Sequence, residues 1–229
     1  MTGMSISELE EMARKCRIEI CKMTHRAQAG HPGGSLSEID ILCALYGHRL
    51  RARSDDPDWD DRDRFILSKG HASPGMYAVL AEMGFISHTD LESYRVKGGV
   101  CQGHVDMKWC PGVDFSAGSL GMGLSYGMGC SIAANIDGSK RNAYVMVGDG
   151  EIQEGSIWEA AMAAAHHELG NLKLFIDCNG IQNDDFCEAQ MRMFDIPAKW
   201  NAFGWAVKVI DGHNICLLYT SPSPRDGLL

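Results

Sequence analysis

Hydrophobic residues recur at two different spacings along this chain, and each spacing predicts one type of element. In several segments they follow the helical period of three and four residues. This period predicts helices over residues 9–29, 36–48, 76–82 and 120–136. The first two follow Ser-x-x-Glu patterns, at Ser7–Glu10 and Ser35–Glu38, which we interpret as capping boxes. Residues 98–118 are rich in Gly and have no period, so we expect a long functional loop there.

Short hydrophobic runs of the kind that form β-strands lie between helical segments. We expect strands at residues 64–67, 143–147, 172–177 and 205–210. Two more helices are expected between the later strands, at residues 156–168 and 197–203. Strands that are separated by helix-length segments are typical of β-α-β units. The pattern therefore predicts an α/β fold, with a mainly parallel sheet and helices on both of its faces.

The C-terminal residues do not continue this pattern. From Cys216 onward the sequence contains two Ser-Pro pairs where a helix should follow the last strand. These residues resemble the translation of a sequencing-library adapter, and we exclude them from the predicted fold. We therefore expect one domain over residues 1–215, truncated at its C-terminal end, and a non-native tail over residues 216–229.

Composition and charge narrow the classes of function. Lys and Arg number 21 and Asp and Glu number 30, which gives a formal net charge of −9. A nucleic-acid backbone or an anionic membrane would repel such a chain, and no apolar run approaches the roughly 18 residues of a membrane span. The nine cysteines are scattered and odd in number, which favours reduced thiols. We expect a cytoplasmic enzyme that binds neither nucleic acid nor a membrane.

The strongest chemical pattern is Gly148-Asp149-Gly150, which directly follows a predicted strand. A carboxylate placed there lies at the carboxyl edge of a parallel sheet, where such sheets bind ligands. Asn179 follows the next predicted strand and should reach the same edge. With the backbone carbonyl of Ile181, these side chains would give three oxygen ligands to Mg²⁺, and a diphosphate could supply others. The two glycines would let a backbone approach that anion closely.

Three other sites suggested by single motifs fit less well. Cys101, His104 and Cys110 lack both a paired Cys-x-x-Cys and a fourth zinc ligand. The acidic run at residues 55–61 lacks the glycine and the final acid of a calcium loop. The glycine-rich stretch at residues 121–127 has the wrong spacing for a dinucleotide site and does not follow a strand.

The Gly-Asp-Gly motif and Asn179 together resemble the thiamine diphosphate motif. The wider chain, from about residue 8 to Asn214, resembles the N-terminal subunit of split transketolases, which corresponds to the diphosphate-binding domain of full-length transketolase. Five further blocks, in family order, carry the resemblance: residues 30–37, 61–72, 103–104, 118–123 and 211–214. The resemblance implies the thiamine diphosphate-binding fold.

The resemblance also implies a role for each matching residue. Positions that match cofactor and metal ligands are His71, Gly118, Leu120, Asp149, Gly150, Asn179 and Ile181, with Mg²⁺, Ca²⁺ or Mn²⁺ as the metal. His31 and His104 match histidines that face the donor and acceptor sugars and can move protons. Glu154 matches an acid that couples to the partner's active site. Departures from the family pattern are Cys178, Asp185 in place of a glycine and Val105 in place of a proline.

The activity implied by the resemblance is that of a transketolase, which moves a two-carbon ketol unit from a ketose phosphate to an aldose phosphate. In this family a glutamate of the pyrimidine-binding domain completes the site. We therefore expect the partner to be a C-terminal transketolase subunit, and we expect an oligomer and no activity of this chain alone. Two other thiamine enzymes, a deoxyxylulose-phosphate synthase and a 2-oxo acid dehydrogenase α-subunit, remain alternatives. So do a non-catalytic cofactor-binding module and, last, a nicotinamide dehydrogenase.

Overall fold

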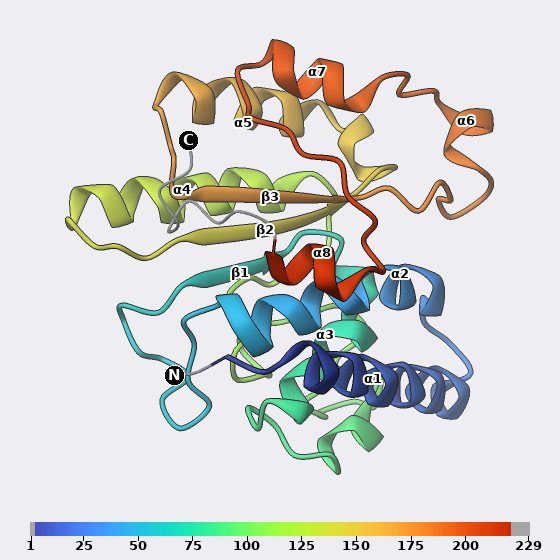
Figure 1. The fold of residues 1–229 in the computed structure, drawn as a ribbon. Helices are drawn as coiled ribbons and strands as arrows, with labels where there is room; N and C mark the ends of the chain where they lie inside the picture. The colour runs from blue at the N-terminus through green and yellow to red at the C-terminus, as the bar shows by residue number, and fades with distance from the viewer. Residues whose placement is uncertain (1–2, 221–229) are drawn as a thin grey trace.

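The structure is a computed structural model that describes residues 3–220 (Figure 1). Its α-helices are α1 (Ile6–Ala27), α2 (Pro32–Ala44), α3 (Ser73–Glu82), α4 (Met122–Ile136), α5 (Gly155–His166), α6 (Cys187–Gln190), α7 (Ile196–Ala202) and α8 (Ile215–Thr220). A π-helical turn, η1 (Leu45–Arg49), extends α2, and short 3-10 turns form η2 (Gly70–Ala72), η3 (Asp90–Ser93) and η4 (Glu151–Gln153). The strands are β1 (Arg64–Leu67), β2 (Ala143–Gly148) and β3 (Leu172–Asp177).

The three strands form one parallel sheet in the order β1-β2-β3. The ladder between β2 and β3 runs from the pair Ala143–Leu172 to the pair Gly148–Asp177. The carboxyl ends of the strands therefore lie at one edge, and in Figure 1 they point towards the start of α2 and the segment that leads to α6. This arrangement confirms the predicted parallel sheet and places the residues after β2 and β3 beside each other.

Alternate residues of the strands face two separate hydrophobic cores. Phe65 and Met146 belong to a core with α1, α2, α3 and α8, whereas Ile66 and Val145 belong to a core with α4, α5 and α7. Figure 1 shows these two groups of helices on opposite sides of the sheet. A sheet that is buried on both faces needs hydrophobic residues at successive positions, which explains the continuous apolar runs of β1 and β2. The predicted α/β fold with helices on both faces is confirmed.

The predicted capping box of the first helix is wrong by two residues. Ser5, not Ser7, precedes α1, and its hydroxyl accepts a hydrogen bond from the backbone N–H of Glu8 at 3.4 Å. The carboxylate of Glu8 accepts in return from the Ser5 N–H at 2.7 Å. The sequence contains the Ser-x-x-Glu spacing twice in overlapping positions, and Ser7 and Glu10 lie inside the first turns of the helix.

The second predicted capping box is also wrong, because α2 begins at Pro32 and not after Ser35. Proline is well tolerated at the first helical position, where no hydrogen bond from its nitrogen is needed. Ser35 instead lies inside the helix, and its hydroxyl donates to the carbonyl oxygens of His31 and Ala72. Glu38 is buried in the same helix. The earlier start places His31 directly at the helix terminus.

The strand predicted at residues 205–210 does not form. This segment has no regular secondary structure, and Val209 is 76% exposed. Within residues 3–220 the sheet has no strand beside this segment to complete a ladder. Trp205 instead donates its indole N–H to the carbonyl of Ala161 at 3.0 Å and packs edge-on against Trp200.

Helix α8 crosses the predicted domain boundary between residues 215 and 216. Leu218 is buried in the same core as α1 and α2, and the Tyr219 carbonyl accepts a hydrogen bond from Arg49 at 2.7 Å. Residues 221–229 of the predicted tail lie outside the described part of the chain, so its non-native origin stays a prediction. Among the helices of residues 3–220, none combines the length and the apolar character that crossing a membrane requires.

Candidate functional site

Asp149 and Asn179 lie at the same edge of the sheet. Asp149 directly follows β2, and Asn179 comes two residues after the end of β3. A carboxylate oxygen of Asp149, Oδ2, accepts a hydrogen bond from the N–H of Gly180 at 2.8 Å. The Asp149 N–H donates to the carbonyl of Asp177 at 3.2 Å. These bonds join the two loops at the edge where the strand order places them.

The donor set at this edge suits a small, hard cation. Asp149, Asn179 and the backbone carbonyl of Ile181 offer carboxylate, amide and carbonyl oxygens, which Mg²⁺ prefers. The other Asp149 oxygen accepts from the Gly150 N–H at 2.9 Å, and Asn179 Oδ1 accepts from the Ile181 N–H at 3.0 Å. The described residues contain no cluster of three His, Cys, Asp or Glu side chains arranged for a metal ion. The expected metal ligands include the side-chain amide of Asn179 and the backbone carbonyl of Ile181, which are not among these side-chain types. The oxygens present therefore fit a Mg²⁺ ion.

The two glycines expected at the cofactor differ in their surroundings. A side chain at Gly118 would meet nothing within 4 Å. A Cβ atom at Gly150 would come within 2.6 Å of the Gln182 Oε1 atom, so a larger residue there would disturb the loop after β3. Leu120, which the resemblance places against the aminopyrimidine ring, is 38% exposed. Gly118 and Leu120 are therefore accessible, whereas Gly150 is packed against Gln182.

Three histidines from separate segments converge near the start of α2. The rings of His31 and His71 are 4.9 Å apart and meet edge to face. Burial lowers the pKa of His71 to about 4, and the nearby His31, Lys69 and His104 contribute to this lowering. Desolvation, followed by the charge of Arg95, also lowers the pKa of His104. Neutral imidazoles both donate and accept hydrogen bonds, which suits them to contact sugar hydroxyls.

Glu154 and Glu151 lie close together in sequence but have different surroundings. Glu154 is exposed at the start of α5 and caps nothing with its side chain. Glu151 is buried, and its carboxylate accepts from the N–H groups of Gly121 at 2.8 Å and Gly148 at 3.1 Å. Burial raises the pKa of Glu151. Glu151 therefore ties the glycine-rich turn before α4 to the end of β2, a role that sequence analysis missed.

Sequence analysis also missed a set of buried charges behind the edge: Glu38, Lys69 and Asp177. Lys69 and Asp177 form an ion pair at 2.6 Å. Each charge lies in or next to a segment predicted to be buried, and a buried charge needs a partner. A charged residue in a segment predicted to be buried was therefore a sign of an ion pair. Its partner could not be named, because these residues are far apart in the sequence.

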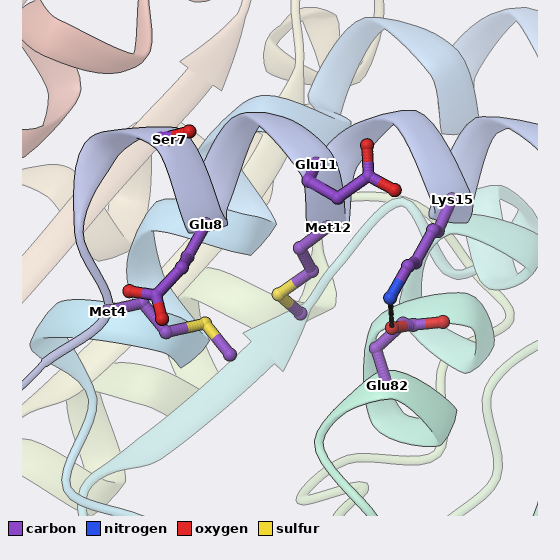
Figure 2. A pocket seen from close by; sticks show the side chains of 7 residues that line it. All are labelled: Met4, Ser7, Glu8, Glu11, Met12, Lys15 and Glu82. Atoms are coloured by element: carbon purple, nitrogen blue, oxygen red, sulfur yellow. Dashed lines mark ion pairs between the residues drawn. The ribbon is translucent and has the colours of Figure 1, made fainter.

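A shallow hollow between α1 and α3 has a different lining. Its volume is about 320 Å³, and its lining residues are Met4, Ser7, Glu8, Glu11, Met12, Lys15 and Glu82. Figure 2 shows the ion pair between Lys15 and Glu82, at 3.7 Å, at one end of this hollow. None of the predicted site residues line it. Exposed ion pairs of this kind contribute little to stability, and we assign the hollow no role in the chemistry.

The chain is similar to known proteins over most of its length. Residues 9–220 match the family described as transketolase, thiamine diphosphate binding domain. The chain is 38% identical over 207 residues to the 6-deoxy-6-sulfo-D-fructose transketolase subunit of Clostridium sp. (strain MSTE9). This alignment covers 90% of this chain and 75% of that protein. It is 39% identical over 209 residues to an apulose-4-phosphate transketolase subunit of Phocaeicola vulgatus, covering 91% and 74% respectively.

Solved structures show the same relationship at the level of the fold. Transketolase from Campylobacter jejuni superposes with a TM-score of 0.90 and 30% sequence identity. The alignment covers 95% of this chain but only 35% of that protein. This chain therefore spans about a third of a full-length transketolase and about three quarters of the two subunits named above.

Proposed function

This chain belongs to the transketolase family, in its thiamine diphosphate binding domain, and from this premise we propose that it is the diphosphate-binding half of a transketolase. The complete enzyme would move a two-carbon ketol unit from a ketose phosphate to an aldose phosphate. The observation that carries this proposal is that Asp149 and the loop of Asn179 lie at one sheet edge and are joined by the hydrogen bond from the Gly180 N–H to Asp149.

In this proposal the edge of the sheet binds the charged end of the cofactor. Thiamine diphosphate, when bound, supplies the carbanion chemistry, and the protein supplies binding and orientation. Asp149, Asn179 and the Ile181 carbonyl would hold Mg²⁺, with Ca²⁺ or Mn²⁺ as substitutes. The cation would neutralise the diphosphate, and the absence of a side chain at Gly150 would let that group approach the backbone.

The histidine cluster would handle the sugars. His31 and His104 are exposed, so their ring nitrogens are accessible to substrate hydroxyls. The lowered pKa of His104 keeps its imidazole neutral at neutral pH, and a neutral imidazole can take a proton from a hydroxyl. His71 is half-buried and also neutral because of its lowered pKa. It would therefore donate a hydrogen bond near the diphosphate without carrying a positive charge.

A partner chain is part of the proposal. The two relatives named above are described as transketolase subunits, which supports a separate chain for the remainder of the enzyme. That partner would be the C-terminal subunit with the pyrimidine-binding domain. Glu154 and Leu120 are exposed in this chain, as residues at a junction with another chain must be before assembly. Without the partner, this chain would not turn over sugars.

The substitution Asp149→Asn tests the metal site. It removes the charge but keeps the size and one acceptor oxygen, so the loop bonds to Gly150 and Gly180 can partly persist. We expect Mg²⁺-dependent binding of thiamine diphosphate to weaken by roughly 100-fold, because a charged ligand is lost. Isothermal titration calorimetry with and without Mg²⁺ measures this effect. Circular dichroism and the melting temperature report whether the fold is retained.

Asp184→Ala is the matched control, because Asp184 is an exposed acid in the loop after β3 with no proposed metal contact. It should bind cofactor and Mg²⁺ like the parent chain. The assignment of the site is wrong if Asp149→Asn also binds them with parental affinity.

A further inference from the structure

Lys69 is a buried lysine whose ammonium group lies between a backbone carbonyl and two carboxylates. Its side chain is 3% exposed. The Nζ atom lies 3.0 Å from the Gly34 carbonyl, 2.9 Å from Glu38 Oε2 and 2.6 Å from Asp177 Oδ2. The ammonium donates hydrogen bonds to the Gly34 carbonyl and to Asp177, whereas its contact with Glu38 is an ion pair. Burial raises the pKa of Glu38 to about 8, and Asp177 lies closer, so Asp177 is the stronger ionic partner.

The lysine also crosses the carboxyl edge of the sheet. Lys69 follows β1, whereas Asp177 ends β3, and β2 lies between these strands. A Cβ atom placed on Gly148, at the end of β2, would lie 3.6 Å from the Lys69 Cδ atom. The stem of the lysine therefore passes over the end of the central strand, next to Asp149. It joins α2 and β3 across the place where the metal ligands are expected.

The carboxylate of Asp177 fixes the side-chain amide of Asn179. Asp177 Oδ2 accepts from Lys69, from the Ser37 hydroxyl and from Asn179 Nδ2, the last at 3.3 Å. Asn179 Nδ2 also lies 3.3 Å from Ser37 Oγ. An ionised carboxylate can only accept, so the amide must turn its NH₂ group towards Asp177. Its oxygen Oδ1 then faces the other way, where it meets the Ile181 N–H.

We propose that Lys69 is a positioning residue, which acts through Asp177 to set the orientation of the Asn179 amide so that its oxygen is presented to the cofactor metal. The inference rests on the proposed function, because it assumes that Asn179 is a metal ligand. Buried ion pairs add little net stability compared with apolar residues, so orientation of a ligand is the better explanation for a charge at this place. Groups that orient metal ligands typically change metal affinity by about 10- to 100-fold.

The substitution Lys69→Met tests this proposal, because it keeps an apolar stem over Gly148 and removes the charge. The first readout uses the full chain with ¹⁵N-labelled asparagine and neither metal nor cofactor. We expect the side-chain NH₂ signals of Asn179 to move towards those of solvent-exposed asparagine and to exchange faster with water. The signals are assigned by their loss in Asn179→Ser.

The second readout is Mg²⁺ affinity at saturating thiamine diphosphate, measured by calorimetry. Lys69→Met should weaken it by about 10- to 100-fold. Ser37→Ala leaves every charge in place and removes one hydroxyl, which accepts from the Asn179 amide and donates to Asp177 and to the Gly34 carbonyl. It is the milder variant, and circular dichroism checks that it folds. We expect it to shift the same NH₂ signals and to weaken Mg²⁺ binding by about threefold to tenfold.

Lys173→Met is the matched control. Lys173 is a partly buried lysine at the opposite end of β3, and its substitution should change neither readout. Unchanged Asn179 signals in folded Lys69→Met, or in Ser37→Ala, would overturn the proposal. If the parent chain itself binds no thiamine diphosphate with Mg²⁺, the proposed function fails, whereas the NH₂ signals still decide how the amide is oriented.

Discussion

His71 shows how the surroundings of one residue affect the whole chain. Its imidazole is half-buried and lies edge-on to His31, and burial lowers its pKa from 6.5 to about 4. In the unfolded chain the same histidine takes up a proton near pH 6.5, whereas in the folded chain it stays neutral until about pH 4. The stability that this group contributes is therefore complete above pH 6.5 and is lost as the pH falls towards 4.

We predict that His71→Gln weakens this pH dependence. Urea midpoints measured at pH 7.5 and pH 5.0 should fall less in the variant than in the parent chain, because glutamine takes up no proton on unfolding. His166→Gln is the control, since His166 is exposed at the end of α5 and should leave the parental pH dependence unchanged. Equal losses of stability in His71→Gln and the parent would show that His71 does not carry the effect.

Individual residues also show which parts of the site could be predicted from the sequence. Asp149 and Asn179 follow two neighbouring strands, and parallel strands end at one edge, so their placement at that edge could be predicted from order alone. Lys69 could not be assigned in this way. Its partners are Gly34, Glu38 and Asp177, and only the folded chain brings these residues to one ammonium group.

At the scale of elements, helix α4 packs closely against the sheet, and two of its glycines allow this packing to be tested. Gly127 faces β2, and a Cβ atom there would overlap the Cγ2 atom of Val145. Gly129 lies two residues further along the same helix, is exposed, and has nothing within 4 Å of an added Cβ. The two glycines therefore differ in packing but share one helix.

We predict opposite effects of alanine at these two glycines. Gly127→Ala should lower the free energy of unfolding by about 1–3 kcal/mol, because it overfills the contact between α4 and β2. Gly129→Ala should raise it by up to about 1 kcal/mol, because alanine favours helix and meets no neighbour. Urea unfolding followed by circular dichroism measures both. Similar changes in the two variants would contradict the packing that we describe for α4.

The elements also show where sequence patterns are sufficient. The bounds of β1 and β3 were predicted correctly, because both are short, mainly apolar runs with helix-length segments on either side, although β1 is largely buried and residues 173–176 of β3 are only half-buried. The start of α1 was missed because two overlapping Ser-x-x-Glu patterns have equal spacing, and only the folded geometry selects Ser5. The segment at 205–210 has the residues of a strand, but a strand also needs a neighbour to pair with, and its own sequence does not supply one.

At the scale of the whole molecule, the described chain leaves an apolar surface next to the proposed site. Leu120, Met122 and Tyr126 are exposed at and just after the start of α4, and Glu154 is exposed close to them. A Cβ atom on Gly121 would lie 2.7 Å from the Cβ of Glu154, which places this acid against the same turn. Large apolar side chains in water are costly, so a partner that covers them would gain free energy on association.

This surface leads to a prediction about assembly. The purified chain should show no ketol transfer, and addition of a cognate subunit with a pyrimidine-binding domain should restore turnover, because the proposed site needs groups from both. A coupled assay with a panel of sugar phosphates measures turnover, and light scattering measures the size of the complex. Asp149→Asn should assemble but remain inactive, whereas Asp184→Ala should behave like the parent. Turnover by the chain without any second polypeptide would contradict the proposed division of the site, since all the catalytic groups would then lie within these 229 residues.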